Sequence, residues 1–122
     1  MGDAIEVGVG DVWSFTAAEN ITSGLVVWLS GDAKVGIATA SGKNPIGVSL
    51  TPASAGKPCA VLMRGIVEIE TTGVGNAVAG DRFTAGAGGK AMKDNTVSGK
   101  YELGFAIENI TRNSKGKIYV TI

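Results

Sequence analysis

The sequence of 122 residues has no histidine and only one cysteine. The missing histidine removes the usual general base of serine and cysteine hydrolases and the ligands of most catalytic zinc sites. The lone cysteine, Cys59, excludes an internal disulfide and a structural zinc ribbon. Because it lies in the apolar stretch 59–63, we expect a buried, unreactive thiol. The composition argues against an enzyme and indicates no metal or other cofactor.

Long hydrophobic runs and an excess of one charge are missing as well. No stretch approaches about 18 apolar residues, the minimum for a membrane-spanning helix, so we expect a soluble protein without an export signal. Eleven Lys and Arg balance eleven Asp and Glu. The net charge therefore gives no reason to expect nucleic acid or an anionic membrane as the partner.

The charges are nevertheless unevenly distributed. Residues 1–33 contain five carboxylates and no Lys or Arg, which leaves a net charge of plus five on residues 34–122. A chain with this dipole could associate head to tail or dock on a basic surface. Exposed charges usually contribute little, so a solvated acidic edge explains the pattern equally well.

Glycine is abundant, with 19 residues, and glycine or proline interrupts nearly every stretch of the chain. This spacing disfavours helices of three or more turns. The clearest periodicity is two, because Ile118, Val120 and Ile122 alternate with polar or amphipathic residues at the end of the chain. Glycines that precede Asp or Lys are typical of reverse turns. The pattern predicts about ten short strands.

Glycine also marks a weak repeat of the first half of the chain in the second half. The offset between matching segments grows from 56 to 57 to 60 residues, as expected when turns gain residues and paired strands do not. The matches are Gly24–Val27 with Gly80–Phe83, Ile46–Val48 with Leu103–Phe105, and Gly56–Lys57 with Gly116–Lys117. We predict an all-β fold with little helix, a small antiparallel barrel or sandwich in which two pseudo-repeated halves pack on each other. Residues 1–122 would form a single β-rich domain.

Motifs that carry chemistry are weak. The Gly-Lys pairs lack the upstream glycine and the following hydroxyl of a phosphate-binding loop. Glu68 and Glu70 share a face of a predicted strand, the geometry of a paired-carboxylate glycosidase, but two solvated glutamates are the ordinary explanation. Trp13 and Trp28 could stack on sugars in a carbohydrate-binding module, although their apolar strand patterns favour core packing.

The same residues resemble the Gly- and Ala-rich capsid cement proteins, or head decoration proteins, of tailed bacteriophages. The resemblance covers about residues 10–122. It is carried in chain order by Gly10–Val12 with Phe15–Ala17, Ile21–Gly24, Ile46–Val48, Arg64–Ile69, Val78–Phe83 and Leu103–Ala106. Trp28 and the charged loop 112–117 depart from the family pattern.

The resemblance implies a structural protein of the virion, made in the cytoplasm of a bacterial host. Such proteins bind the outer surface of the expanded head and clamp adjacent subunits of the major capsid protein. They commonly bind as homotrimers at three-fold and quasi-three-fold positions, without direct contact to nucleic acid or membrane. A carbohydrate-binding β module on a virion or cell surface is the alternative.

The acidic first segment is the candidate for contact with a partner. It has no opposing charges of its own, and the first residues of a domain are usually loose until they are tied down. We therefore expect residues 1–9 to form an extended N-terminal arm. The candidate contact residues are Asp3, Ile5, Glu6, Val7, Asp11 and Glu19.

Overall fold

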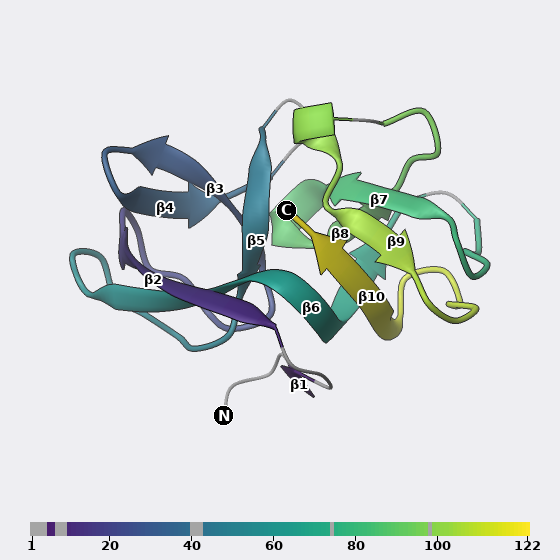
Figure 1. The fold of residues 1–122 in the computed structure, drawn as a ribbon, viewed down its shortest axis with the longest axis horizontal. Coiled ribbons are helices and arrows are strands. Elements are labelled where there is room, and N and C mark those ends of the chain that lie inside the picture. The colour runs from purple at the N-terminus through teal and green to yellow at the C-terminus, as the bar shows by residue number, and fades with distance from the viewer. Residues whose placement is uncertain (1–4, 7–9, 40–42, 74, 98) are drawn as a thin grey trace.

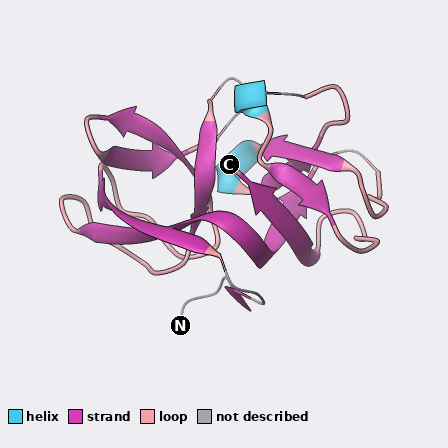
Figure 2. Ribbon diagram, viewed as in Figure 1, coloured by secondary structure: helices cyan, strands magenta, loops and turns pink. Residues whose placement is uncertain are grey.

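The computed structural model describes residues 5–6, 10–39, 43–73, 75–97 and 99–122. Within these residues the chain forms ten strands and two single-turn 3-10 helices (Figure 2). The prediction of about ten short strands with little helix is confirmed. The elements are β1 (Ile5–Glu6), β2 (Asp11–Ala17), β3 (Val26–Gly31), β4 (Lys34–Ile37), β5 (Pro45–Ser49), β6 (Pro58–Thr72), β7 (Arg82–Ala85), η1 (Ala87–Gly89), β8 (Ala91–Lys93), η2 (Gly99–Tyr101), β9 (Gly104–Ala106) and β10 (Lys115–Thr121).

The strands close into two five-stranded barrels that share β6. In the first barrel, β6 pairs with β2, β2 with β4, β4 with β3, β3 with β5, and β5 again with β6. In the second, β6 pairs with β8, β8 with β7, β7 with β9, β9 with β10, and β10 again with β6. Figure 1 shows β6 running beneath both barrels. Its 15 residues let it end one barrel and begin the next.

The two barrels have the same strand order and the same pairing directions, so the predicted repeat is present. Val27 pairs with Gly47 in the first barrel as Phe83 pairs with Gly104 in the second. The isolated bridge between Ile21 and Ala53 recurs between Ala77 and Ile110. The offsets of 56 and 57 residues deduced from the sequence therefore relate equivalent positions.

The offset of 60 residues is wrong. Gly56 corresponds to Asn113, since both have positive φ angles, of 84° and 57°. Each is followed by a residue whose amide closes a turn: the Lys57 amide donates to the Ser54 carbonyl oxygen, and the Ser114 amide donates to the Thr111 carbonyl oxygen. Gly116 instead lies inside β10 against Ile110. The Gly-Lys dipeptide occurs in both halves, but it is not at equivalent positions, because asparagine also adopts the left-handed conformation that this turn requires.

Each barrel contains one parallel pair, which the expectation of an antiparallel barrel did not include. Thr16 pairs with Lys34 in parallel, and so does Thr71 with Ala91. The cause is the connection between the first and second strand of each barrel. This connection is long enough to cross the end of the barrel. The second strand of the hairpin that follows, β4 or β8, therefore lies beside the first strand of the barrel, β2 or β6, and runs in the same direction.

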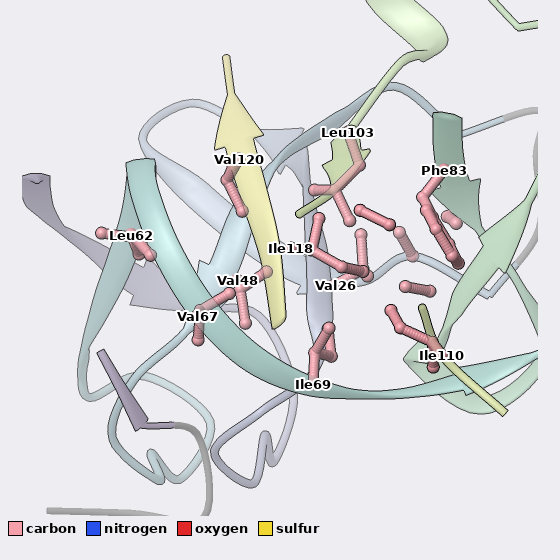
Figure 3. Packing of buried hydrophobic residues seen from close by; sticks show 14 of the residues in the cluster. Val26, Val48, Leu62, Val67, Ile69, Phe83, Leu103, Ile110, Ile118 and Val120 are labelled. Atoms are coloured by element: carbon pink, nitrogen blue, oxygen red, sulfur yellow. The ribbon is translucent and has the colours of Figure 1, made fainter. Parts of the chain in front are cut away.

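The core consists of two clusters. The smaller cluster fills the first barrel with side chains that include Val27, Val35 and Val61. The larger cluster fills the second barrel and also takes in Ala38, which follows β4, and three buried strand residues of the first barrel, Val26, Val48 and Leu62 (Figure 3). These three form one cross-strand row, since Val48 pairs with both Val26 and Leu62. We call them the covering row, because they face the second barrel.

Glycine is required where β5 passes β6 and where β9 passes β10 at close range. A Cβ on Gly104 would lie 1.9 Å from the carbonyl oxygen of Tyr119, and one on the equivalent Gly47 would lie 2.2 Å from that of Leu62. These neighbours are backbone atoms and cannot rotate away, so both glycines of the repeat are fixed by the same contact.

The substitution Gly104→Ala should lower the free energy of unfolding by about 3 kcal/mol, because β9 and β10 must separate to admit the methyl group. Urea titration at pH 7 measures this. Gly31→Ala is the matched control, since its Cβ would meet only side-chain carbons at 3.8 Å, and it should change stability by less than about 0.5 kcal/mol. Equal stability of the two variants would contradict the steric explanation.

Candidate functional site

Cys59, Glu68 and Glu70, the side chains considered above for catalysis, do not form a reaction centre. Cys59 is fully buried, and desolvation raises the pKa of its thiol, so the expected buried thiol is confirmed. Glu68 is half-buried, whereas Glu70 lies on the exposed face of β6 with one carboxylate oxygen 3.7 Å from Lys90 Nζ. Among the described residues, no group of three or more Cys, Asp or Glu side chains could hold a metal ion.

The predicted contact residues lie in different settings. Ile5 and Glu6 form β1, which pairs with Glu68 and Val67 of β6 in antiparallel orientation. Asp3 and Val7 lie outside the described residues. The structure therefore ties part of the N-terminal segment to the shared strand.

Asp11 and Glu19 both lie on the surface of the first barrel. Asp11 begins β2 and pairs with Arg64 of β6, next to the position where β1 adds to the same edge. Glu19 accepts a hydrogen bond of 2.9 Å from the backbone amide of Ile37, so it holds the loop after β2 against β4. This local structural role was not visible in the sequence, because it joins residues 18 positions apart.

The two tryptophans differ, and the expectation of core packing is wrong for Trp13. Trp13 is 64% exposed. Trp28 is half-buried on the outside of β3, where Lys43 Nζ lies 4.1 Å from its ring centroid. The alternation in β2 and β3 places Trp13 on the inner face of the barrel wall and Trp28 on the outer face. They do not form one platform for stacking on a sugar.

Trp13 belongs to an apolar layer at the end of the first barrel. Leu29 of β3 and Met63 of β6 lie at the same end, beside the β3–β4 hairpin. Leu29 is 48% exposed and Met63 half-buried. Single exposed apolar residues are ordinary on protein surfaces, but a barrel end formed by two exposed apolar residues and a half-buried one is a candidate interaction site. We call this layer the open end.

A second candidate surface lies on the outer wall of the second barrel. Phe105 of β9 pairs with Arg82 of β7 on one side and with Tyr119 of β10 on the other. The rings of Phe105 and Tyr119 meet edge to face, with centroids 5.5 Å apart. Both aromatic residues are half-buried, and Arg82 is exposed. We call these three residues the aromatic row.

The sequence profile of phage cement proteins matches residues 42–122, two thirds of the chain. The chain belongs to the phage cement protein family. The structure is also similar to the crystal structure of the head fiber gp8.5 N base of bacteriophage phi29, with a TM-score of 0.63. The likeness covers 93% of this chain and 95% of that chain at 17% sequence identity, so it concerns the fold. No curated protein sequence matches the chain.

Membership of the cement family confirms the resemblance deduced from the sequence and supports a structural role associated with the phage capsid. Within the described residues, no helix is long and apolar enough to cross a membrane. Two surfaces of this cement-family chain, the open end and the aromatic row, are candidates for protein binding, and the sequence analysis predicted neither of them. The exposure of Trp13 and Leu29 has no local signal, because both occupy inward positions of their strands.

Two grooves lie where the barrels meet. The larger, of about 470 Å³, lies between Asn44–Ile46 at the start of β5 and the segment from η2 to Glu102, with the C-terminal residues along one side. The smaller, of about 160 Å³, separates Thr22–Leu25 from Glu68–Glu70 and Lys115. Both are open seams between the barrels, and neither gathers a set of convergent catalytic groups.

Asp81 fixes the loop that enters the second barrel. Its carboxylate accepts hydrogen bonds from the Val78 amide at 2.9 Å and from Asn95 Nδ2 at 3.0 Å, with Lys93 Nζ at 3.4 Å. The Val78 amide is the main cause, followed by Asn95, of a pKa of Asp81 below the ordinary value of 3.8. A lowered pKa means that the carboxylate stabilises the fold above the ordinary pKa and loses this contribution as the pH falls through the lowered value.

We expect Asp81→Asn to lower the free energy of unfolding by about 1 kcal/mol at pH 7. The difference from the wild type should shrink as the pH falls from the ordinary value of 3.8 through the lowered pKa of folded Asp81, because the folded wild-type carboxylate becomes protonated there. Urea titrations at pH 7 and at acidic pH measure both values. Asp32→Asn, in the exposed β3–β4 turn, is the control and should stay within about 0.5 kcal/mol of wild type at either pH. A pH-independent loss for Asp81→Asn would contradict the role of its charge.

Proposed function

We propose that this protein is a capsid decoration protein that binds the outer surface of the expanded phage head and clamps adjacent subunits of the major capsid protein. The observation that carries the proposal is the match to the phage cement family over residues 42–122. This match agrees with the expectation from the sequence of a structural protein that acts through its surface.

A two-barrel body built on one strand suits this task. Because β6 belongs to both barrels, a force on one barrel passes to the other through a continuous backbone ladder. A body that grips more than one capsid subunit gains effective concentration at each further contact, so each interface can be modest. Clamping of this kind resists the separation of neighbouring subunits.

We further propose that the protein acts as a homotrimer at three-fold and quasi-three-fold positions, with its N-terminal segment against the major capsid protein. The candidate contacts are Asp3, Ile5, Glu6, Val7, Asp11 and Glu19. The positions of β1 and Asp11 along one edge of β6 support a continuous binding strip at the junction of the barrels. Acidic residues there suit a basic patch on the capsid.

The carbohydrate-binding alternative draws support only from the exposure of Trp13. Trp28 does not complete a platform with it, since the two indoles lie on opposite faces of the barrel wall. The decoration function therefore remains our proposal.

Sedimentation with undecorated expanded heads tests the function directly. The protein should co-sediment with saturable binding, at a stoichiometry fixed by the lattice positions of the head. Unexpanded heads serve as the control for the preference for the expanded surface. Absence of co-sedimentation with expanded heads would overturn the proposal.

Deletion of Met1–Val9 tests the N-terminal segment. We expect the affinity for heads to fall at least about tenfold, equivalent to about 1.4 kcal/mol, and the melting temperature to change little, since the deletion removes only the two-residue β1 from the ladder. An unchanged binding curve, or a loss of binding explained by unfolding in the melting profile, would contradict this assignment.

A further inference from the structure

Each residue of the open end has an equivalent in the second barrel, but the equivalent residues are not exposed. The repeat relates Trp13, which pairs with Val61, to Val67, which pairs with Ile118. It likewise relates Leu29, which pairs with Val35, to Ala85.

The remaining member of the open end, Met63, corresponds to Val120. Val67, Ala85 and Val120 are all fully buried. The same layer is therefore exposed in one barrel and covered in the other.

The cover is the first barrel itself. Val26, Val48 and Leu62, the covering row, are fully buried and belong to the same cluster as Val67 and Val120 (Figure 3). The β7–β8 hairpin at this end also meets the first barrel, because Gly89 packs against Leu25 and Ile37 at a distance that leaves no room for a Cβ. One contact type thus joins the barrels within the chain: an outer row of one barrel closes the hairpin end of the other.

The repeat reproduces the outer row as well. Val26, Val48 and Leu62 correspond to Arg82, Phe105 and Tyr119, because both sets are the cross-strand row of the equivalent strands. The aromatic row is therefore the equivalent of the covering row in the second barrel, but it covers no barrel end within the chain. The chain leaves one hairpin end and one outer row unused.

We propose that the two unused surfaces bind each other between copies of this chain, with the aromatic row of one copy against the open end of the next. The occupant of the open end is a second copy because the intrachain contact already shows this pairing of surfaces. Larger residues at the open end, Trp13 and Met63 where the second barrel has Val67 and Val120, extend the apolar layer toward a partner. Aromatic residues with an adjacent arginine are the composition that interface centres favour.

Charge adds orientation to this contact. Asp11 and Asp32 lie on the rim of the open end, and Arg82 and Lys117 lie on the wall that carries the aromatic row. Lys34 and Arg64, which pairs with Asp11, lie on the rim too. Because these charges offset the two carboxylates and exposed pairs contribute little, the apolar and aromatic side chains supply most of the binding. The uneven distribution of charge along the sequence is consistent with head-to-tail association.

A contact between two different surfaces is heterologous, and it closes into a ring where the rotation between copies allows. This inference rests on the proposed function in one respect, since it supplies the contact of the proposed homotrimer. The contact itself can be tested without capsids, so that failure of self-association and failure of head binding are separate results.

Sedimentation velocity of the purified full chain at increasing concentration measures the association. The wild type should form a discrete oligomer. Trp13→Ser and Tyr119→Ser should each raise the dissociation constant at least about 30-fold, the size expected for a residue at the centre of an interface. A wild type that stays monomeric at every concentration, or association unchanged in either variant, would overturn the proposal.

Further variants distinguish a loss of self-association from a loss of folding. Leu29→Ser repeats the test at the open end, and Phe105→Ser repeats it in the aromatic row. Val78→Ser, at a residue that is 56% exposed in the loop at the opposite end of the second barrel, should associate like the wild type. Thermal melts identify any variant that has unfolded, and the second variant of the same surface then decides.

Mixing separates a head-to-tail contact from a symmetric one. Trp13→Ser retains an intact aromatic row, and Tyr119→Ser retains an intact open end, so the mixture should form a one-to-one heterodimer that neither variant forms alone. If Tyr119→Ser self-associates as well as the wild type, the open end binds another surface, and the proposal is wrong. If the mixture stays monomeric, the two surfaces do not bind each other.

Discussion

The constraint on which the structure depends is that one strand belongs to two closed barrels. Along one edge, β6 binds β2, β1 and β8 in succession, and along the other it binds β5 and β10. A register shift at the start of β2 leaves Met63 as an extra residue, where a bulge bends the strand. Gly10 passes so close to β6 at this point that a Cβ would lie 2.1 Å from the Arg64 carbonyl oxygen. Each barrel needs its own part of β6 to close, so one continuous strand holds the two barrels together.

The repeat is symmetric in its backbone and asymmetric in its side chains. Val26, Val48 and Leu62 are apolar because the second barrel covers them, whereas the equivalent Arg82, Phe105 and Tyr119 face outward. Interiors of small barrels leave room only for side chains, so each barrel end must be closed by another surface or remain exposed. In this chain one end is closed internally and the other presents Trp13.

Membership of the phage cement family supports a structural role associated with the capsid. The described surface fits that role: the shared strand joins two barrels, and the grooves between them contain no convergent catalytic groups. Local charges have structural tasks instead. Asp81 holds the loop before β7 and Glu19 the loop after β2, so these two carboxylates anchor loops.

The sequence by itself determined the all-β class, the ten short strands, the buried Cys59 and the repeat, because alternation and glycine turns are local properties of the chain. It also matched Gly47 with Gly104, since close backbone approach demands glycine at both positions. The sequence misplaced the Gly56 equivalent and the environment of Trp13. Only the tertiary structure decided that β6 is shared, that each barrel contains one parallel pair, and that the same inward layer is buried in one barrel and exposed in the other. Alternation assigns a residue to the inner face of a strand, but burial depends on which distant surface closes the end of the barrel.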